Sequence, residues 1–212
     1  MASFSTLTDS FSAGSLNGTV WGTQGDGVTI SSGHASINTT SSSYFSGMYT
    51  NSTYDLTNAS VLFQVISVPT PDSYPPVANM GIGFYQGGGY ENLMWGYDMT
   101  NLKWVPSWDG GTMTAAPTGA AKWLRIRNAG GSGGSVYWDY STDGLNWTNA
   151  GSQTVAAITT AAGTGLGGVT FDLTSLYLSF YNSEGNSNGS FVIDNVNVAP
   201  PVPKSGGLLL FM

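Results

Sequence analysis

The apolar residues of this chain come in short alternating runs, and this spacing constrains the fold more than any other feature of the sequence. The runs are separated by Gly, Asn, Asp, Ser and Pro, and no stretch keeps a helical spacing for longer than a turn or two. Alternation with a period of two places side chains on opposite faces of a strand. The sequence therefore predicts an all-β chain with almost no helix.

One predicted hairpin is specific enough to fix a register. Residues 123–127 and 136–140 alternate, and a glycine-rich segment centred on Ser132 separates them. Pairing about Ser132 sets Arg125 opposite Asp139 and leaves Leu124 and Ile126 on the other, apolar face. An opposite-charge pair across two strands adds about 0.2–1 kcal/mol and helps to hold the register.

Other strands are predicted less sharply. Residues 61–68 are apolar on both faces, which is typical of a central strand. Asp143-Gly144 predicts a turn between two alternating strands. Further strands are expected at residues 78–85, 93–97, 102–105, 176–181 and 191–198.

The composition excludes several classes of partner. The 212 residues include 5 Lys+Arg against 12 Asp+Glu, giving a net charge of −7, and no Cys. Binding to nucleic acid or to an anionic membrane needs basic residues, so neither is expected. Without Cys, disulfides, thiolate metal sites and thiol catalysis are excluded. No apolar run reaches the roughly 18 residues of a membrane-spanning helix.

The two ends of the chain differ from the rest. Residues 1–7 lack the basic and apolar regions of a secretory signal. We therefore expect a virion protein made in the host cytoplasm, with a secreted protein whose leader was removed as the alternative. Residues 1–198 are predicted to form one domain, followed at 199–212 by a Pro-rich linker and an apolar tail.

The tail is predicted to dock on another subunit, because five exposed apolar residues would otherwise favour aggregation. The alternatives are that it folds back onto its own domain or is disordered. Its residues are Leu208, Leu209, Leu210, Phe211 and Met212.

The order of motifs resembles the concanavalin A-like (laminin-G-like) jelly rolls. The resemblance covers most of residues 4–198, and it implies two packed antiparallel sheets of about six or seven strands each. Its members include lectins, glycosidases, carbohydrate-binding modules and phage surface proteins, so it defines the fold more closely than the function. The matching pieces are Phe11, Leu16, Trp21, 28–30, 35–37, 123–127, 140–147 and 191–198.

Catalysis is not expected. The resemblance implies that catalytic members carry clustered glutamates, because retaining cleavage needs two carboxyl groups about 5–5.5 Å apart. Here Glu91 and Glu184 are isolated. His34 is the single histidine, and no G-x-S-x-G nucleophile motif is present. We therefore predict a protein that is not an enzyme.

No cofactor is predicted, and a structural Ca²⁺ ion is kept as an alternative. Some jelly-roll relatives bind calcium through loop carboxylates, but no stretch of this sequence has the spacing of a calcium-binding loop. Each candidate carboxylate has a plainer role as a turn cap. The candidates are Asp98, Asp109, Asp143, Asp172 and Asp194.

Aromatic residues between positions 84 and 108 are the best candidates for ligand binding. Sugar rings stack on exposed Trp and Tyr while amides and carboxylates bind the hydroxyls. The alternative is that most of these rings fill the core or its rim. Core or hairpin packing is what we expect for Trp21, Trp123, Trp138 and Trp147. The predicted glycan platform consists of Tyr90, Trp104, Trp108, Asn92 and Asp109.

These observations favour a structural or adhesion component of a bacteriophage virion, on the tail or capsid surface. We expect it to bind other virion proteins or copies of itself through the tail, and to contact host cell-surface polysaccharide. The alternative is a carbohydrate-binding, lectin-like module of a secreted bacterial protein.

Overall fold

A computed structural model describes residues 1–38, 45–69, 77–83, 91–98, 101–108, 111–113, 121–165, 171–183 and 190–200. The strands are β1 Trp21–Gln24, β2 Val28–Ser31, β3 His34–Ile37, β4 Phe45–Thr50, β5 Ser60–Ser67, β6 Val77–Gly83, β7 Glu91–Asp98, β8 Lys103–Trp108, β9 Gly111–Thr112, β10 Trp123–Ala129, β11 Ser135–Ser141, β12 Thr148–Thr154, β13 Tyr177–Ser183 and β14 Phe191–Asp194. The helices are α1 Val155–Gly165 and the short 3₁₀ turns η1 Phe4–Thr6 and η2 Gly131–Gly133.

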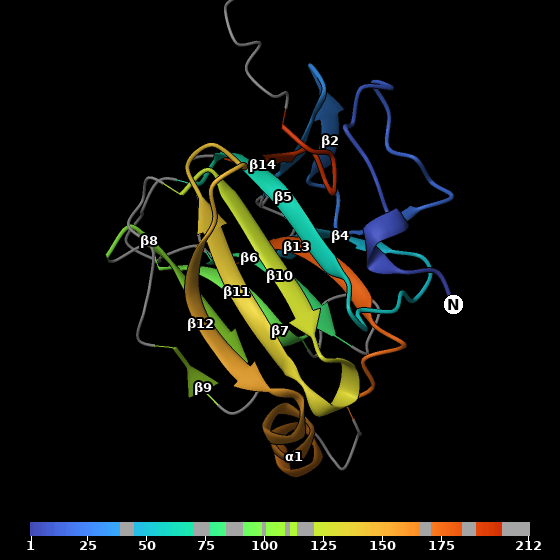
Figure 1. Cartoon of the computed structure of the whole chain (residues 1–212). Coiled ribbons are helices and arrows are strands. Elements are labelled where there is room, and N and C mark those ends of the chain that lie inside the picture. The colour runs from blue at the N-terminus through green and yellow to red at the C-terminus, as the bar shows by residue number, and fades with distance from the viewer. Residues whose placement is uncertain are drawn as a thin grey trace, which may run out of the picture.

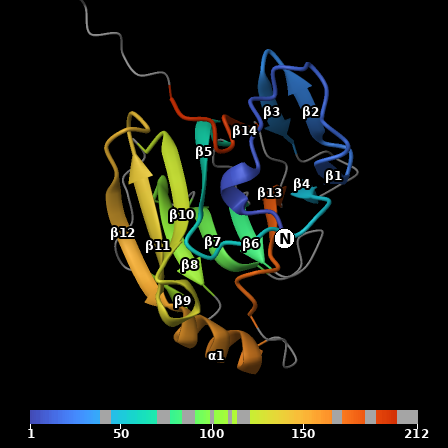
Figure 2. The ribbon, with the colours of Figure 1, turned by 45° about the vertical axis from the view of Figure 1, so that its right-hand side comes forward.

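The strands form two antiparallel sheets packed face to face (Figures 1 and 2). Within the described residues, sheet A has the order β1-β4-β13-β6-β7-β8-β9, and sheet B has the order β12-β11-β10-β5-β14-β3-β2. Neighbours in a sheet come from distant parts of the chain, as in a jelly roll. The all-β sandwich predicted from the sequence is confirmed.

Large aromatic side chains fill the space between the sheets. Phe63 of sheet B lies at the centre, with its ring edge-on to that of Phe180 of sheet A at 5.0 Å between centroids. Trp104 and Phe191 pack against the same ring, at 6.4 and 6.5 Å. Edge-to-face pairs of this kind add about 0.5–1.5 kcal/mol beyond the area they bury.

Two buried tryptophans join the sheets by hydrogen bonds in opposite directions. The Trp95 indole of β7 donates to the backbone carbonyl of Arg125 in β10, at 3.2 Å. The Trp138 indole of β11 donates to the carbonyl of Met94 in β7, at 2.9 Å. Both rings are fully buried, so an unpaired indole N–H would be costly. The two bonds fix how β7 sits against β10 and β11.

The hairpin predicted from the sequence is confirmed residue by residue. Arg125 pairs with Asp139, Leu124 with Tyr140, and Ile126 with Trp138. The connecting segment is the 3₁₀ turn η2, preceded by Gly130 with φ of 83°. Strand β5 is central as expected, because it pairs with β10 on one side and β14 on the other.

The predicted Asp-Gly turn is a loop of six residues, 142–147, between β11 and β12. Asp143 accepts hydrogen bonds from the backbone N–H groups of Leu145 and Asn146, both at 2.8 Å. These bonds and the Asn146 side chain hold the pKa of Asp143 well below its ordinary value. At Gly144 φ is +75°, and an added Cβ would lie 2.9 Å from the Trp123 ring. The position therefore requires glycine.

Helix α1 was not predicted from the sequence. Its buried residues Val155, Ile158 and Ala162 follow a helical spacing, but alanines and threonines at most other positions hide that pattern. Thr154 caps the helix by accepting from the N–H of Ala157. The helix packs beside β12 and η2, at one end of an otherwise all-β sandwich (Figure 2).

Asn197 ties the two ends of the described chain together. Its side-chain amide donates to the carbonyls of Phe4 and Leu7, at 2.7 and 2.8 Å. Its side-chain oxygen accepts from the N–H of Leu62 in β5, at 2.8 Å. These contacts hold η1 and the segment after β14 against the centre of sheet B.

Trp138→Phe should lower the free energy of unfolding by at least about 2 kcal/mol, because it removes the indole N–H that bonds to Met94 and part of a fully buried ring. Urea unfolding followed by far-UV circular dichroism would measure this. Trp147→Phe, which changes a half-buried ring outside the core, is the control. An equal loss in both variants would show that the buried hydrogen bond contributes nothing specific.

Candidate functional site

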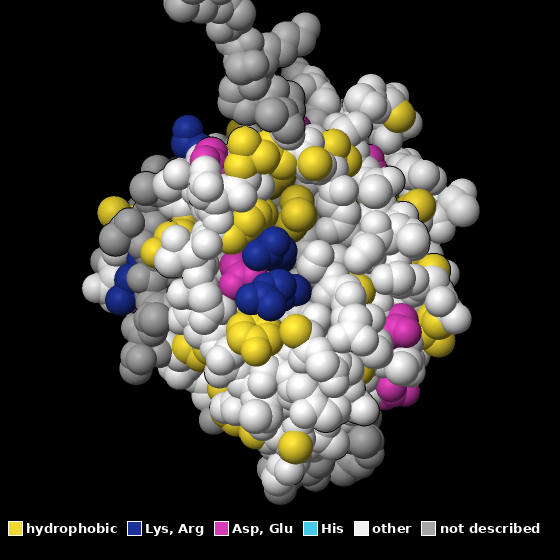
Figure 3. All heavy atoms as spheres, viewed as in Figure 1, with side chains coloured by type: hydrophobic (Ala, Val, Ile, Leu, Met, Phe, Trp, Pro, Cys, Tyr) yellow, Lys and Arg dark blue, Asp and Glu magenta, His cyan; other side chains and the backbone are white. Residues whose placement is uncertain are grey.

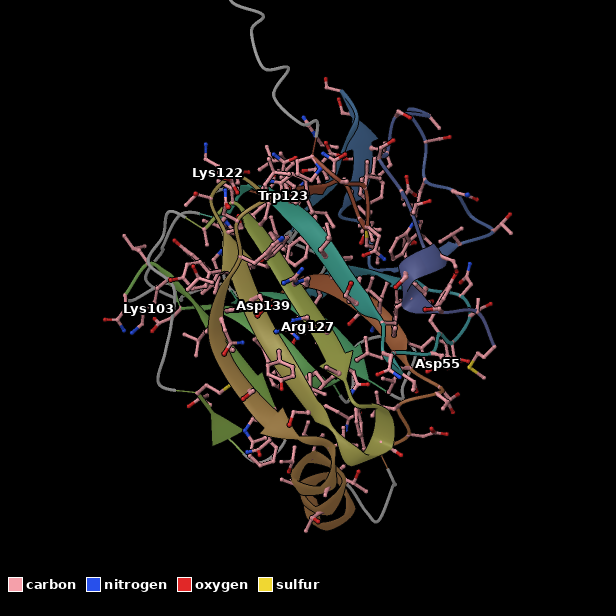
Figure 4. All side chains as sticks on the ribbon, in the orientation of Figure 1. Asp55, Lys103, Lys122, Trp123, Arg127 and Asp139 are labelled. Carbon is pink, nitrogen blue, oxygen red and sulfur yellow. The ribbon has the colours of Figure 1, made fainter. Side chains whose placement is uncertain are left out.

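A charged cluster lies in the middle of the outer face of sheet B (Figures 3 and 4). One carboxylate oxygen of Asp139 accepts from Arg125 Nε and Nη2, at 3.0 and 2.8 Å, and from Arg127 Nε, at 2.7 Å. The other accepts from the Asn149 amide at 3.0 Å. The Asp139 side chain is 3% exposed, whereas those of Arg125 and Arg127 are 21% and 32% exposed. We call Arg125, Arg127, Asp139 and Asn149 the arginine cluster.

Each arginine also stacks on an aromatic ring. The guanidinium carbon of Arg125 lies 4.1 Å from the centre of the Trp147 ring, and that of Arg127 lies 4.1 Å from the centre of the Tyr137 ring. Such stacking restricts both guanidinium planes. Hydrophobic side chains border the charged centre above and below in Figure 3.

A β-bulge brings Asn149 into the arginine cluster. Trp138 pairs with Gly151, but the next residue, Asp139, pairs with Asn149, so Ala150 is the extra residue of β12. Without this shift the residue opposite Asp139 would be Ala150. The bulge thus supplies the fourth hydrogen bond that the buried carboxylate receives.

The outer face of sheet A has a different character. Directly paired residues share a face, and two adjacent rows of pairs cross the middle of this one. Neither of these two rows contains a charged residue, whereas pairs nearer the strand ends of sheet A include Asp98 with Lys103 and Gly83 with Glu91. The first row is Gly22, Tyr49, Ser179, Gly81, Met94, Ser107 and Thr112, and the second is Gln24, Gly47, Tyr181, Asn79, Gly96 and Val105.

Two tyrosine rings lie along this surface. An added Cβ at Gly22 would lie 2.5 Å from the Tyr49 ring, so this ring covers the glycine on the neighbouring strand. The Tyr181 hydroxyl on β13 reaches the Met94 sulfur on β7, at 3.7 Å, across the intervening strand β6. Both tyrosines are half-buried. We call the two rows around Tyr49 and Tyr181 the tyrosine face.

The predicted glycan platform does not form as expected. Trp104 is 1% exposed and packs in the core, so its ring cannot receive a sugar. Asn92 is fully buried, and Trp108 is half-buried with its ring against the core. On β8, Trp104 and Trp108 occupy alternate positions that face inward. Tyr90 and Asp109 lie outside the described residues.

Tyr97 and Trp104 instead line a small cavity of about 300 Å³ at one end of the sandwich. Gln64, Ala121 and Lys122 contribute to its wall. Burial and the neighbouring Asp98 carboxylate raise the pKa of Tyr97, so its phenol stays protonated at neutral pH. Both aromatic side chains thus belong to the core and also line the cavity.

Sequence reasoning missed Tyr49 and Tyr181. Each follows a fully buried residue, Met48 and Phe180, and so faces away from the core. That alternation was readable in residues 45–50 and 177–183. What was not readable is the pairing of β4 with β13, which lie more than a hundred residues apart.

No catalytic arrangement is evident in the described part of the chain. His34 Nδ1 lies 3.3 Å from Asp194 Oδ2, and no described serine hydroxyl bonds to the imidazole. Burial raises the pKa of Asp194, against the effect of His34 and a hydrogen bond from the Asn195 N–H. Within the described residues, the pair therefore has no serine in the position that a triad requires.

The described calcium candidates act in turns. Asp98 accepts from the N–H and side chain of Asn101, and Asp172 from the N–H and hydroxyl of Thr174. Among residues that the structure describes, no three His, Cys, Asp or Glu side chains gather to hold a metal.

The docking tail, residues 208–212, lies outside the described ranges. Among the described helices, none is long and apolar enough to cross a membrane.

No known protein family model matches the sequence, and no curated protein matches it. Solved structures do resemble the fold. The carbohydrate recognition domain of Emp47p superimposes with a TM-score of 0.60 at 11% identity, over 92% of this chain and 94% of its own. The Crh5 transglycosylase has a TM-score of 0.57 at 10% identity, over 92% and 85% of the two chains.

A phage protein is among the similar structures. The CBM2 module of the evolved Dit of Lactobacillus casei BL23 phage J-1 has a TM-score of 0.50 at 12% identity. The match covers 90% of this chain and 92% of the module. These likenesses show a concanavalin A-like lectin fold, shared by binding domains and by glycan-processing enzymes.

Asp139→Asn should lower the free energy of unfolding by about 2–4 kcal/mol, because it leaves two partly buried guanidinium groups without their carboxylate. Asp26→Asn removes the same charge from an exposed position and is the control. Thermal unfolding of the two variants measures the difference. Equal melting temperatures would contradict a structural role for the Asp139 carboxylate.

Proposed function

We propose that this chain is a non-catalytic glycan-binding module displayed on a bacteriophage particle, and that it binds sugars on the tyrosine face. The observation that carries the proposal is the arrangement of Tyr49 and Tyr181, two half-buried rings that lie along two rows of uncharged residues in sheet A. A pyranose presents an apolar C–H face and a rim of hydroxyls. The flat rings match the C–H face of such a ligand, and the exposed Gln24 side chain at the end of the second row can bond to its hydroxyls.

The fold supports a binding role. The Emp47p domain is a carbohydrate recognition domain, and this chain shares its architecture over nearly its whole length. Crh5 is a transglycosylase on a similar fold, so the fold alone allows catalysis. Cleavage by glycosidases generally requires two carboxyl groups on either side of the bond. The two rows of the tyrosine face hold none, and Asp98, at the end of β7, bonds to Asn101 in a turn.

The phage assignment rests on two observations. One is the likeness to the module of the phage J-1 Dit. The other is a composition with 8% charged residues and many polar uncharged ones, typical of proteins displayed outside cells. Several copies on one particle would turn weak sugar contacts into tight attachment. A lectin-like module of a secreted bacterial protein is the second candidate, favoured by the same surface and by the Emp47p likeness.

The apolar tail is proposed as the means of attachment to the particle. Its five apolar residues follow a Pro-rich segment that begins at Ala199. Deleting residues 208–212 should reduce incorporation into purified particles severalfold, measured by quantitative mass spectrometry. Replacing the same residues by Ser and Gly tests whether apolarity or mere length matters. Full incorporation of both variants would contradict docking through the tail.

Tyr181→Ala and Tyr49→Ala should each weaken binding to a neutral glycan identified on an array by about tenfold or more, because each removes a stacking surface. Ile66→Ala is the control, since it removes an exposed apolar side chain from sheet B. Calorimetry with the free glycan gives the affinities. Melting temperatures verify that every variant is folded.

Gly22→Ala offers a finer test, because it leaves both tyrosines in the sequence. The added methyl group would meet the Tyr49 ring and move it from its position over β1. Binding should weaken while the melting temperature changes little. An array without any neutral hit, or a hit with the same affinity in all variants, would overturn the assignment of the tyrosine face.

A further inference from the structure

Positive charge is scarce in this chain, and two of its 5 Lys+Arg lie next to each other in the arginine cluster. Among the described residues, Asp139 is the carboxylate that bonds to Arg125 and Arg127. The cluster therefore carries a local charge of about +1 in a chain whose net charge is −7.

Arg127 is not needed to hold the register of strands β10 and β11. Arg125 stands directly opposite Asp139 and bonds to it through two nitrogens, which is enough to hold the register. Arg127 adds one bond, through Nε. Among the described residues, neither of its Nη groups has an acceptor. Arginine carries five N–H donors, and four of those on Arg127 belong to these two groups.

The unused donors are held in place. Arg127 is fixed at Nε by Asp139 and on one face by the Tyr137 ring. Its side chain is 32% exposed, and the charged cluster reaches the molecular surface in Figure 3. A guanidinium group restrained in this way loses little conformational freedom when it binds, and its fork matches the two oxygens of a carboxylate.

We propose that the arginine cluster binds the carboxylate of an acidic sugar, such as a uronic acid, at the Nη edge of Arg127. One carboxylate would balance the local charge. The overall charge of −7 disfavours dense polyanions, so a single acidic group on an otherwise neutral molecule fits best. The bordering rings of Trp147 and Tyr137 offer apolar surface to a sugar ring. This site is on the opposite sheet from the tyrosine face and does not depend on it.

The test uses two sugars that differ only in the acidic group, methyl β-glucuronide and methyl β-glucoside. In an NMR titration, the glucuronide should shift the Arg127 Nε–H and Trp147 indole signals. It should bind about tenfold or more tightly than the glucoside, because a charge-assisted hydrogen bond depends on the carboxylate. Added salt should weaken its binding.

Arg127→Gln should weaken glucuronide binding by about tenfold or more, since it removes the charge and the fork. In this variant Asp139 keeps its two hydrogen bonds from Arg125, so the fold should persist. Arg127→Lys keeps the charge without the fork and should also bind more weakly. Lys103→Gln, on sheet A, is the matched control and should bind as the unchanged chain does.

Three outcomes would overturn the proposal. One is glucuronide binding that is equal in Arg127→Gln and Lys103→Gln. Another is acetate binding as tightly as the glucuronide, which would show an unspecific anion contact. The third is preference for a glutamate-containing peptide over the glucuronide, which would indicate an acidic protein partner. Neutral-glycan binding at the tyrosine face is measured separately, so the two sites can fail independently.

Discussion

Two indole hydrogen bonds, one from Trp95 and one from Trp138, cross between the sheets in opposite directions and fix their relative position. The positions of both outer faces depend on these two bonds. The bonds end on the carbonyls of Arg125 and Met94. Arg125 is part of the arginine cluster, and Met94 is part of the tyrosine face. These two bonds give each buried indole N–H an acceptor. They also fix one backbone carbonyl in each candidate binding surface.

The two surfaces divide the polar chemistry of the molecule. Sheet B presents guanidinium groups fixed by a buried carboxylate, while sheet A presents tyrosine rings among small uncharged residues. The charged residues of sheet A, Glu91, Asp98 and Lys103, lie at strand ends, and the two rows of the tyrosine face contain none. A ligand that stacks through apolar contact and one that carries a carboxylate would thus meet different sides of the sandwich.

Local patterns allowed much of the fold to be predicted. The β10–β11 register followed from Arg125, Asp139 and the glycine-rich turn, because all of its information lies within twenty residues. The platform failed because a strand's alternation shows which residues share a face and leaves open which face meets the core. Trp104 went inward with its strand. Tyr49 and Tyr181 came together only through a long-range pairing that no local pattern encodes.

The bulge at Ala150 limits how this domain can change in evolution. Inserting one more residue between Asn149 and Gly151, or deleting Asn149 itself, would change which β12 residue stands opposite Asp139. The buried carboxylate would then lose the hydrogen bond from the Asn149 amide. Length changes in this segment should therefore occur in the loop at 142–147, where no pleat has to be conserved, and the spacing from Thr148 to Gly151 should stay constant among relatives.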